Sequence, residues 1–131
     1  MTGSTEFSAD VTPENLDCLF DFAFNLSISE VEARWLIGVL LGAVEDVQLG
    51  LRGQLLETIC ELYNCVESPA GLDIAPVIRL MPTFDTNELL HSLLIVEWQG
   101  SMKYCDEIQR YSSHRNSEIR GMVQTICGPR K

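Results

Sequence analysis

Apolar residues recur at three- and four-residue intervals along almost the whole chain, and this spacing restricts the fold more than any other feature of the sequence. Apolar residues make up 46% of the 131 residues and are mostly Leu, Ile and Val, whereas aromatic residues make up only 8%. Few segments alternate polar and apolar residues as a half-buried strand does. The sequence therefore predicts an all-α fold with an aliphatic core, and the length suits one domain.

The first helix is predicted from Pro13 onward. Thr12 is a typical capping residue, and Pro13 suits the first helical position because its missing N–H would have no partner there. An acidic first turn follows, together with one apolar stripe formed by Leu16, Leu19, Phe20, Ala23 and Phe24. We expect this stripe to face the core and the carboxylates to face solvent.

Two more helices are predicted before residue 68. A capping box at Ser29 and Glu32, or the equivalent pattern two residues earlier, starts a helix that is apolar on almost every side. We expect that helix to be the central buried one. Asp46 is the expected cap of the next helix, which runs to about Cys65.

The second half contains an internal similarity at an interval of thirty positions. After a break at residues 68–71, two helix pairs are predicted within residues 72–127, and a second capping box, at Asp85 and Glu88, starts the longer helix of the first pair. Shifting the first pair by thirty superimposes its apolar grid on the second. The matched positions are Ile74 with Tyr104, Ile78 with Ile108, Glu88 with Glu118, Leu89 with Ile119, Leu93 with Val123, and Val96 with Ile126. Such units bury their apolar faces by stacking.

The last unit, residues 108–126, has a polar turn followed by Glu118, Ile119 and Arg120, and in this it resembles a HEAT or HEAT-like repeat. The unit before it has Leu90 in place of the arginine, and residues 1–70 match the pattern only loosely. The resemblance implies stacked antiparallel helix pairs in a right-handed superhelix of about six to seven helices. It also implies a protein-binding scaffold, without naming the partner.

These boundaries give a predicted domain organisation. We expect a flexible N-terminal segment over residues 1–12, one helical domain over 13–127 and a tail over 128–131. The domain divides into an acidic half, 13–67, and a neutral half, 72–127, that contains both repeat-like units.

All of the net charge lies in the first half of the chain. Residues 1–70 carry twelve carboxylates against two bases, Arg34 and Arg52, whereas residues 71–131 carry seven of each sign, so the total of −10 belongs to the first half. Such a field repels nucleic acid and anionic membranes and attracts a basic protein surface. The only adjacent bases, Arg130 and Lys131, are too few to neutralise a phosphate backbone.

No catalytic or metal-binding pattern is recognisable. The two histidines, His91 and His114, are far apart, and neither His-x-x-x-His nor Cys-x-x-Cys occurs, so we expect no metal site and no cofactor. A Cys–His nucleophile, for example Cys60 or Cys105 with His91, has no local signature. We therefore expect the protein not to be an enzyme.

Pairs of carboxylates three or four residues apart on one helix allow three interpretations. Glu57 with Glu61, or Asp17 with Asp21, has the spacing needed for acid–base or divalent-ion chemistry. Both pairs lie on predicted outward faces without a phosphate-binding loop nearby, which favours an ordinary solvated surface. A protein-recognition surface remains the alternative, because three successive segments contribute carboxylates.

Cysteine usage and the N-terminal residues indicate a cytoplasmic location. The five cysteines (Cys18, Cys60, Cys65, Cys105 and Cys127) are odd in number and suit reduced thiols in the core. Residues 1–12 contain no basic region or apolar run typical of a secretory signal. The strongest apolar run, residues 35–44, is too short to span a membrane, so no membrane association is expected.

Together these features favour a protein-binding function. A small, acidic, helical protein of this kind resembles the immunity proteins of bacterial toxin–immunity pairs, and the resemblance implies inhibition of a basic, cytoplasm-acting toxin or effector domain. The alternative is a HEAT-like adaptor or regulatory subunit that binds a peptide or a larger enzyme. The oligomeric state stays open.

Seven carboxylates form the predicted contact set for that partner. They lie on the first helix, on the turn after the second helix and on the third helix: Glu14, Asp17, Asp21, Glu45, Asp46, Glu57 and Glu61. Trp35 and Trp98 are candidate aromatic anchors, although a core position is the more ordinary interpretation for both tryptophans.

Overall fold

The structure, a computed structural model, describes residues 12–25, 28–68, 72–100 and 102–128, and these residues contain helices and no strands. The predicted all-α class is therefore confirmed. The described helices, with short 3₁₀ segments labelled η, are α2 (Pro13–Phe24), α3 (Glu30–Ala43), η1 (Leu49–Leu51), α4 (Arg52–Tyr63), α5 (Ala75–Leu80), η2 (Met81–Thr83), α6 (Thr86–Gln99), α7 (Cys105–Ile108), η3 (Gln109–Tyr111) and α8 (Ser117–Cys127).

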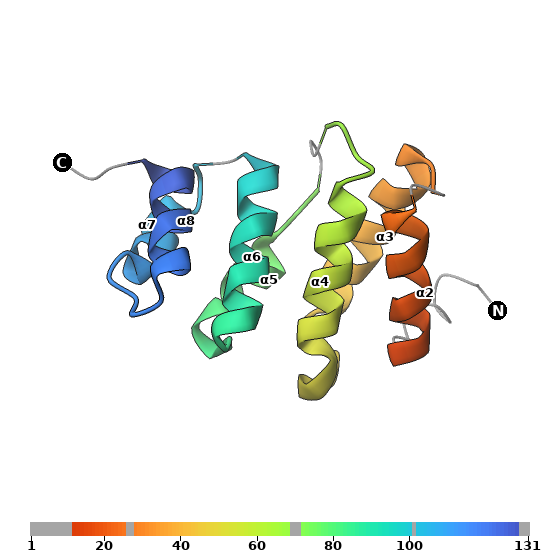
Figure 1. Cartoon of the computed structure of the whole chain (residues 1–131), viewed down its shortest axis with the longest axis horizontal. Coiled ribbons are helices and arrows are strands. Elements are labelled where there is room, and N and C mark those ends of the chain that lie inside the picture. The colour runs from red at the N-terminus through yellow and green to blue at the C-terminus, as the bar shows by residue number, and fades with distance from the viewer. Residues whose placement is uncertain (1–11, 26–27, 69–71, 101, 129–131) are drawn as a thin grey trace.

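Four helices, α2, α4, α6 and α8, stand side by side in one layer (Figure 1). They run in the same direction. Hydrogen bonds between equivalent ends of neighbouring helices show this for α2, α4 and α6. Near the starts of α2 and α4, the side chain of Gln54 donates a 3.1 Å hydrogen bond to the carbonyl of Pro13. Near the ends of α4 and α6, the hydroxyl of Tyr63 donates a 2.9 Å hydrogen bond to Gln99.

Behind this layer lie the connecting helices α3, α5 and α7 (Figure 1). Helix α3 packs on α4 and also touches α5, and α7 packs on α8. Helices α2 and α3 form one end of the row, and α7 and α8 form the other. The interior helices α4 and α6 are therefore covered on more sides than the terminal ones.

Capping side chains fix the starts of the long helices. The Ser29 hydroxyl accepts a 3.1 Å bond from the Glu32 backbone N–H, and the Glu32 carboxylate accepts one of 3.1 Å from the Ser29 N–H. The same reciprocal arrangement joins Asp85 and Glu88 at the start of α6. Both predicted capping boxes are thus confirmed. Thr12, as predicted, caps α2 by accepting a bond from the Asn15 N–H at 3.1 Å.

Two expectations for the first half are wrong. Asp46 does not cap the third helix, because the chain first forms the 3₁₀ turn η1, and α4 begins only at Arg52. The central helix is α4 and not α3: α4 contacts α2, α3 and α6, whereas Val31 and Trp35 of α3 are 79% and 52% exposed. The reason is topological, since a helix at the end of a row lacks a neighbour on one side whatever its sequence.

The two units of the second half share both element order and buried positions. Each consists of a short α-helix, a 3₁₀ turn and a longer α-helix. The matched residues are buried in both units at three positions: Ile78 and Ile108, Leu89 and Ile119, and Leu93 and Val123. At two others the residue in the last unit is only half-buried: Tyr104 against Ile74, and Ile126 against Val96. The last unit is less covered because it ends the row.

A buried ion pair joins α4 to α6. The Arg52 guanidinium donates to both Glu88 carboxylate oxygens, at 3.3 and 3.1 Å, and to the Thr83 carbonyl at 3.1 Å. The ring of Phe84 lies 4.8 Å from the guanidinium carbon, measured to the ring centroid. This geometry fixes the register of the two helices, and the sequence indicated only the capping role of Glu88.

One contiguous set of buried apolar residues runs from Leu16 on α2 to Val123 on α8. Of the segments predicted to flank the helical domain, residues 1–11 and 129–131 lie outside the described residues. Thr12 belongs to the start of α2 and Gly128 to the end of α8.

Candidate functional site

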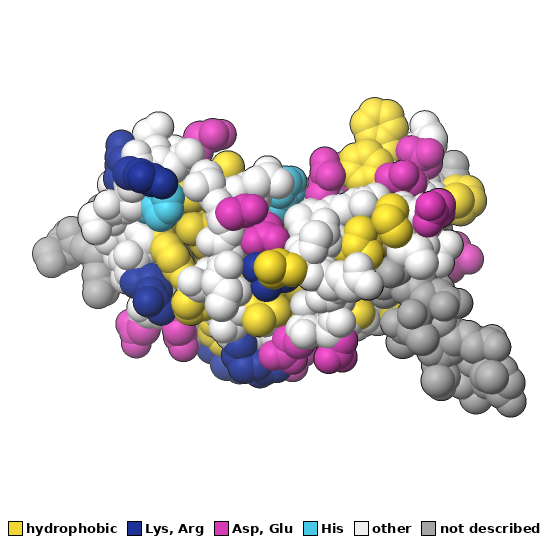
Figure 2. Space-filling view, turned by 90° about the horizontal axis from the view of Figure 1, so that it is seen from below, with side chains coloured by type: hydrophobic (Ala, Val, Ile, Leu, Met, Phe, Trp, Pro, Cys, Tyr) yellow, Lys and Arg dark blue, Asp and Glu magenta, His cyan; other side chains and the backbone are white. Residues whose placement is uncertain are grey.

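Five of the seven predicted contact carboxylates lie on two neighbouring helices of the front layer. We call Glu14, Asp17 and Asp21 of α2, together with Glu57 and Glu61 of α4, the acidic face. All are exposed except Glu61, which is half-buried and accepts a 3.2 Å bond from the side chain of Asn64. In Figure 2, Asp and Glu side chains gather around hydrophobic ones at the α2 end of the row.

A groove between α2 and α4 lies within this face. Asp17 and Phe20 line it from α2, and Gln54, Glu57 and Thr58 line it from α4. The Gln54 side chain donates a 2.9 Å bond to the Asp17 carboxylate and so holds it at the helix boundary. Two carboxylates and an aromatic ring on one groove suit the ammonium or guanidinium group of a Lys or Arg side chain.

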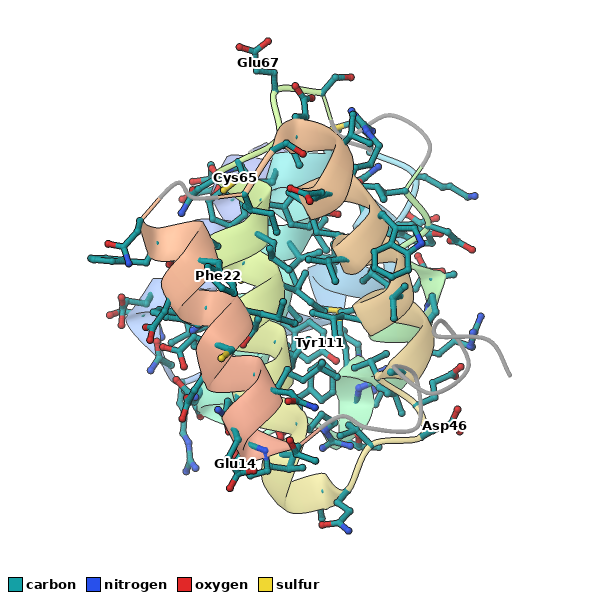
Figure 3. The ribbon with its side chains drawn as sticks, turned by 90° about the vertical axis from the view of Figure 1, so that its right-hand side faces the viewer. Glu14, Phe22, Asp46, Cys65, Glu67 and Tyr111 are labelled. Atoms are coloured by element: carbon teal, nitrogen blue, oxygen red, sulfur yellow. The ribbon has the colours of Figure 1, made fainter. Side chains whose placement is uncertain are left out.

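The other two predicted carboxylates lie apart from this face. Glu45 and Asp46 follow α3, and Figure 3 places Asp46 on the side of α3 opposite to Glu14. Arg79 of α5 binds both Glu45 oxygens, at 3.0 and 3.1 Å. This pairing lowers the pKa of Glu45 and raises that of Arg79. Glu45 is therefore neutralised by a base that lies far from it in the sequence.

The two bases of the first half leave the acidic face uncompensated. Arg34 pairs with Glu30 on the same helix at 3.3 Å and donates to the carbonyl of Ser68. Arg52 is buried and pairs with Glu88 of the neutral half. Both guanidinium groups are thus engaged away from the acidic face, and its negative potential is stronger than the count of bases suggests.

The geometry around Cys60 contradicts its pairing with His91 as a nucleophile and its base. The Cys60 thiol donates to the backbone carbonyl of His91 at 3.3 Å, whereas the His91 ring lies against the carbonyl of Asn87 at 2.9 Å. Burial, and then the charges of Glu57 and Glu61, raise the pKa of Cys60 well above its ordinary range. Such a thiol does not form a thiolate near neutral pH.

The remaining cysteines only partly match the expected core position. Cys60 is buried, but Cys18 is exposed, and Cys65, Cys105 and Cys127 are intermediate. None of the five cysteines, all of which lie among the described residues, takes part in a disulfide. Among the described residues no group of three or more His, Cys, Asp and Glu side chains is placed to hold a metal ion.

Neither tryptophan occupies the core. Trp98 stacks on Tyr63 with ring centroids 5.9 Å apart and is 38% exposed, and Trp35 is 52% exposed. Phe22 and Phe24 of α2 are exposed as well, although Phe24 was expected within the buried stripe. Sequence periodicity contained no signal for the exposure of Trp35, Phe22 and Phe24, because it follows from the position of α2 and α3 at one end of the row (Figure 1).

Among the described residues, none of the helices combines the length and the apolar character needed to cross a membrane. Comparisons with protein-family models, with curated proteins and with solved structures found no match for this chain.

Proposed function

We propose that this chain is a protein-binding inhibitor, an immunity protein that neutralises a basic toxin or effector domain acting in the cytoplasm. The observation that carries the proposal is the groove in the acidic face, where Asp17 and Glu57 from two helices lie beside the ring of Phe20. Basic side chains of the partner would bind there, and the surrounding carboxylates would speed its approach. The front layer would act as a rigid, HEAT-like stack that presents this groove.

Three features support binding as the function of this surface. Asp17 and Glu57 come from separate helices and line one groove. A helix face that is only solvated has no need of carboxylates from two helices at one groove. Both bases of the first half are engaged elsewhere. The supporting helix α4 is packed between α2, α3 and α6, so the groove is held by a covered element.

The test compares three proteins as bait: the wild type, the variant Asp17→Asn/Glu57→Gln, and the control Glu97→Gln/Asp106→Asn. Both double variants remove two exposed carboxylates, and Asn at position 17 retains an acceptor for Gln54. Each bait is incubated with a lysate of its source cells at about 50 mM and about 500 mM NaCl, since salt screens exposed charges. Captured proteins are identified by mass spectrometry, and each is then assayed for toxicity with and without the bait.

We expect one basic partner that the wild type and the control retain at low salt, that high salt releases, and whose toxicity the wild type suppresses. The variant should bind it about ten- to a hundredfold more weakly, because it loses two pairings with basic groups and each contributes on the order of 1 kcal/mol. Equal retention by the variant and the wild type would contradict the proposal. A partner with no toxic activity would rule out the immunity function.

A peptide-binding adaptor is the second candidate. The observation that favours it is the apolar surface at the α2–α3 end of the row, where Phe22, Val31 and Trp35 are exposed. An adaptor of this type would retain its partners at high salt, because apolar contacts are not screened.

A further inference from the structure

A second groove lies at the α2–α3 end of the row, away from the groove of the acidic face. It has a volume of about 280 Å³ and is lined by Phe22 of α2, Ile28 of the connection, and Glu32, Trp35 and Leu36 of α3. Figure 3 looks directly at this end of the molecule and labels Phe22 on the near side of α2. The volume lies just below the range of about 300–1,000 Å³ typical of small-molecule sites, so the groove suits protein side chains better than a cofactor.

The groove is apolar at its base and negatively charged at its rim. Four of its five lining residues are apolar or aromatic, and the fifth is the carboxylate of Glu32. Its bonds to Ser29 lower the pKa of Glu32, so the carboxylate is charged at neutral pH. An occupant that combines an apolar side chain with a neighbouring cation would satisfy both features.

The charges argue against two other occupants. In a two-fold dimer the same patch meets itself, which would bring the carboxylate of Glu32 toward its copy. Residues 1–11 of this chain carry Glu6 and Asp10 and no basic side chain, so they would add negative charge to a negative rim. Repeat proteins ordinarily cover such an end with a polar outer face, and the exposed aromatic residues here depart from that rule.

We propose that this groove is the apolar anchor site for the basic partner: a Leu, Met or Phe side chain of the partner inserts between Phe22 and Trp35, and a Lys or Arg beside it pairs with Glu32. The inference rests on the proposed function and assigns its partner a second contact. The acidic face supplies long-range attraction, whereas the groove supplies burial of apolar area, which slows dissociation.

The test uses the fluorescence of Trp35 with synthetic peptide probes. The substitution Trp98→Phe leaves Trp35 as the sole tryptophan and keeps an aromatic ring against Tyr63. Three peptides of equal length are titrated: one of alternating Leu and Lys pairs, one with Ser in place of every Leu, and one with Glu in place of every Lys. We expect a saturable blue shift of the Trp35 emission with the Leu–Lys peptide alone.

Matched variants of the Trp98→Phe protein locate the binding. Phe22→Ser should weaken the Leu–Lys peptide about tenfold, an effect typical of an aromatic anchor, whereas Leu49→Ser, at an exposed apolar residue outside the groove, should leave its affinity unchanged. Glu32→Gln should weaken it several-fold and still permit the capping box. Circular dichroism melting of each variant checks that the fold is retained.

Several outcomes would overturn the proposal. An equal emission shift with the Ser–Lys peptide would show that the protein recognises the charge of the peptide alone. An equal loss of affinity for the Leu–Lys peptide in Leu49→Ser would place the binding outside the groove. Sedimentation velocity that shows a wild-type dimer dissociated by Trp35→Ser would assign the groove to a second copy. A red shift of Trp35 on removal of residues 1–11 would assign it to that segment.

The experiments distinguish failure of the anchor-site proposal from failure of the proposed function. Loss of Leu–Lys binding in Asp17→Asn/Glu57→Gln but not in Phe22→Ser would leave the acidic face as the contact and overturn the anchor. The reverse result, with binding insensitive to salt, would retain the groove and contradict the proposed function.

Discussion

At the scale of single residues, burial decides which groups can react. Cys60 is buried against the carbonyl of His91, and its raised pKa keeps the thiol protonated, whereas Cys18 is exposed on α2. We predict that iodoacetamide at about pH 8, near the ordinary pKa of a thiol, alkylates Cys18 rapidly and leaves Cys60 unmodified in the folded protein. Peptide mass spectrometry over time measures both rates. Similar rates for the two thiols in the native protein would contradict the burial of Cys60.

The Arg52–Glu88 pair gives a second prediction at this scale. Replacing Arg52 by Met leaves a buried carboxylate without its partner, and we expect the free energy of unfolding to fall by about 3–5 kcal/mol. Adding Glu88→Gln should restore part of that loss, because a neutral amide still accepts the Asp85 N–H bond. Urea unfolding measures both variants. If Arg52→Met destabilises by less than about 1 kcal/mol, the pair is not as desolvated as its burial indicates.

At the scale of whole elements, the capping box of α3 makes stability dependent on pH. Its bonds to Ser29 lower the pKa of Glu32 below the ordinary value of 4.5. A carboxyl with a lowered folded-state pKa stabilises the fold above its unfolded pKa, and that stability is lost as the pH falls through the folded pKa. We predict that Glu32→Gln reduces the loss of stability below about pH 4.5, the ordinary value.

Thermal melting from pH 7 to pH 3 measures this effect, with Glu97→Gln on the exposed side of α6 as the control. The Glu45–Arg79 pair contributes with the same sign, since it also lowers a carboxyl pKa. A difference between Glu32→Gln and the wild type that grows toward neutral pH and is absent in acid would fit the capping role. A constant difference at every pH would contradict it.

Local signals in the sequence sufficed for most helix boundaries but not for the order of burial. Thr12, Ser29 and Asp85 cap helices as predicted, because capping depends on residues three positions apart. The prediction that Asp46 caps a helix was wrong, because η1 lies between Asp46 and α4. Nothing within one turn of Asp46 distinguishes a capping residue from a turn residue. The position of α3 at the end of the row depends on packing between distant segments, which periodicity alone does not report.

The same distinction applies to the candidate site. The carboxylate rows on α2 and α4 could be read from three- and four-residue spacing, but their meeting at the groove required knowledge that these helices are neighbours. The pairings of Arg79 with Glu45 and Arg52 with Glu88 each join residues more than thirty positions apart. Single-sequence reasoning has no signal for such pairs.

At the scale of the whole molecule, the uneven charge predicts how salt affects stability. The carboxylates of the acidic face repel one another across the boundary of α2 and α4, so screening them should stabilise the fold. We predict that the melting temperature rises between about 10 and about 150 mM NaCl, the range in which the Debye length falls to roughly 8 Å. The rise should be smaller in Asp21→Asn/Glu61→Gln, as calorimetry can measure. An equal rise in both proteins would mean that the acidic face is not the source of the repulsion.

The common direction of α2, α4, α6 and α8 has an electrostatic consequence of its own. Peptide dipoles in parallel helices add, and each helix places a partial charge of roughly half a unit at either end. Of the connecting helices, only α3 is comparable in length, with 14 residues, whereas α5 has six and α7 has four, so cancellation within the row is incomplete. One edge of the molecule is therefore lined by N–H groups and the other by carbonyls. A charged partner would experience a field with one positive and one negative edge. This field comes from the backbone, so no side-chain substitution removes it.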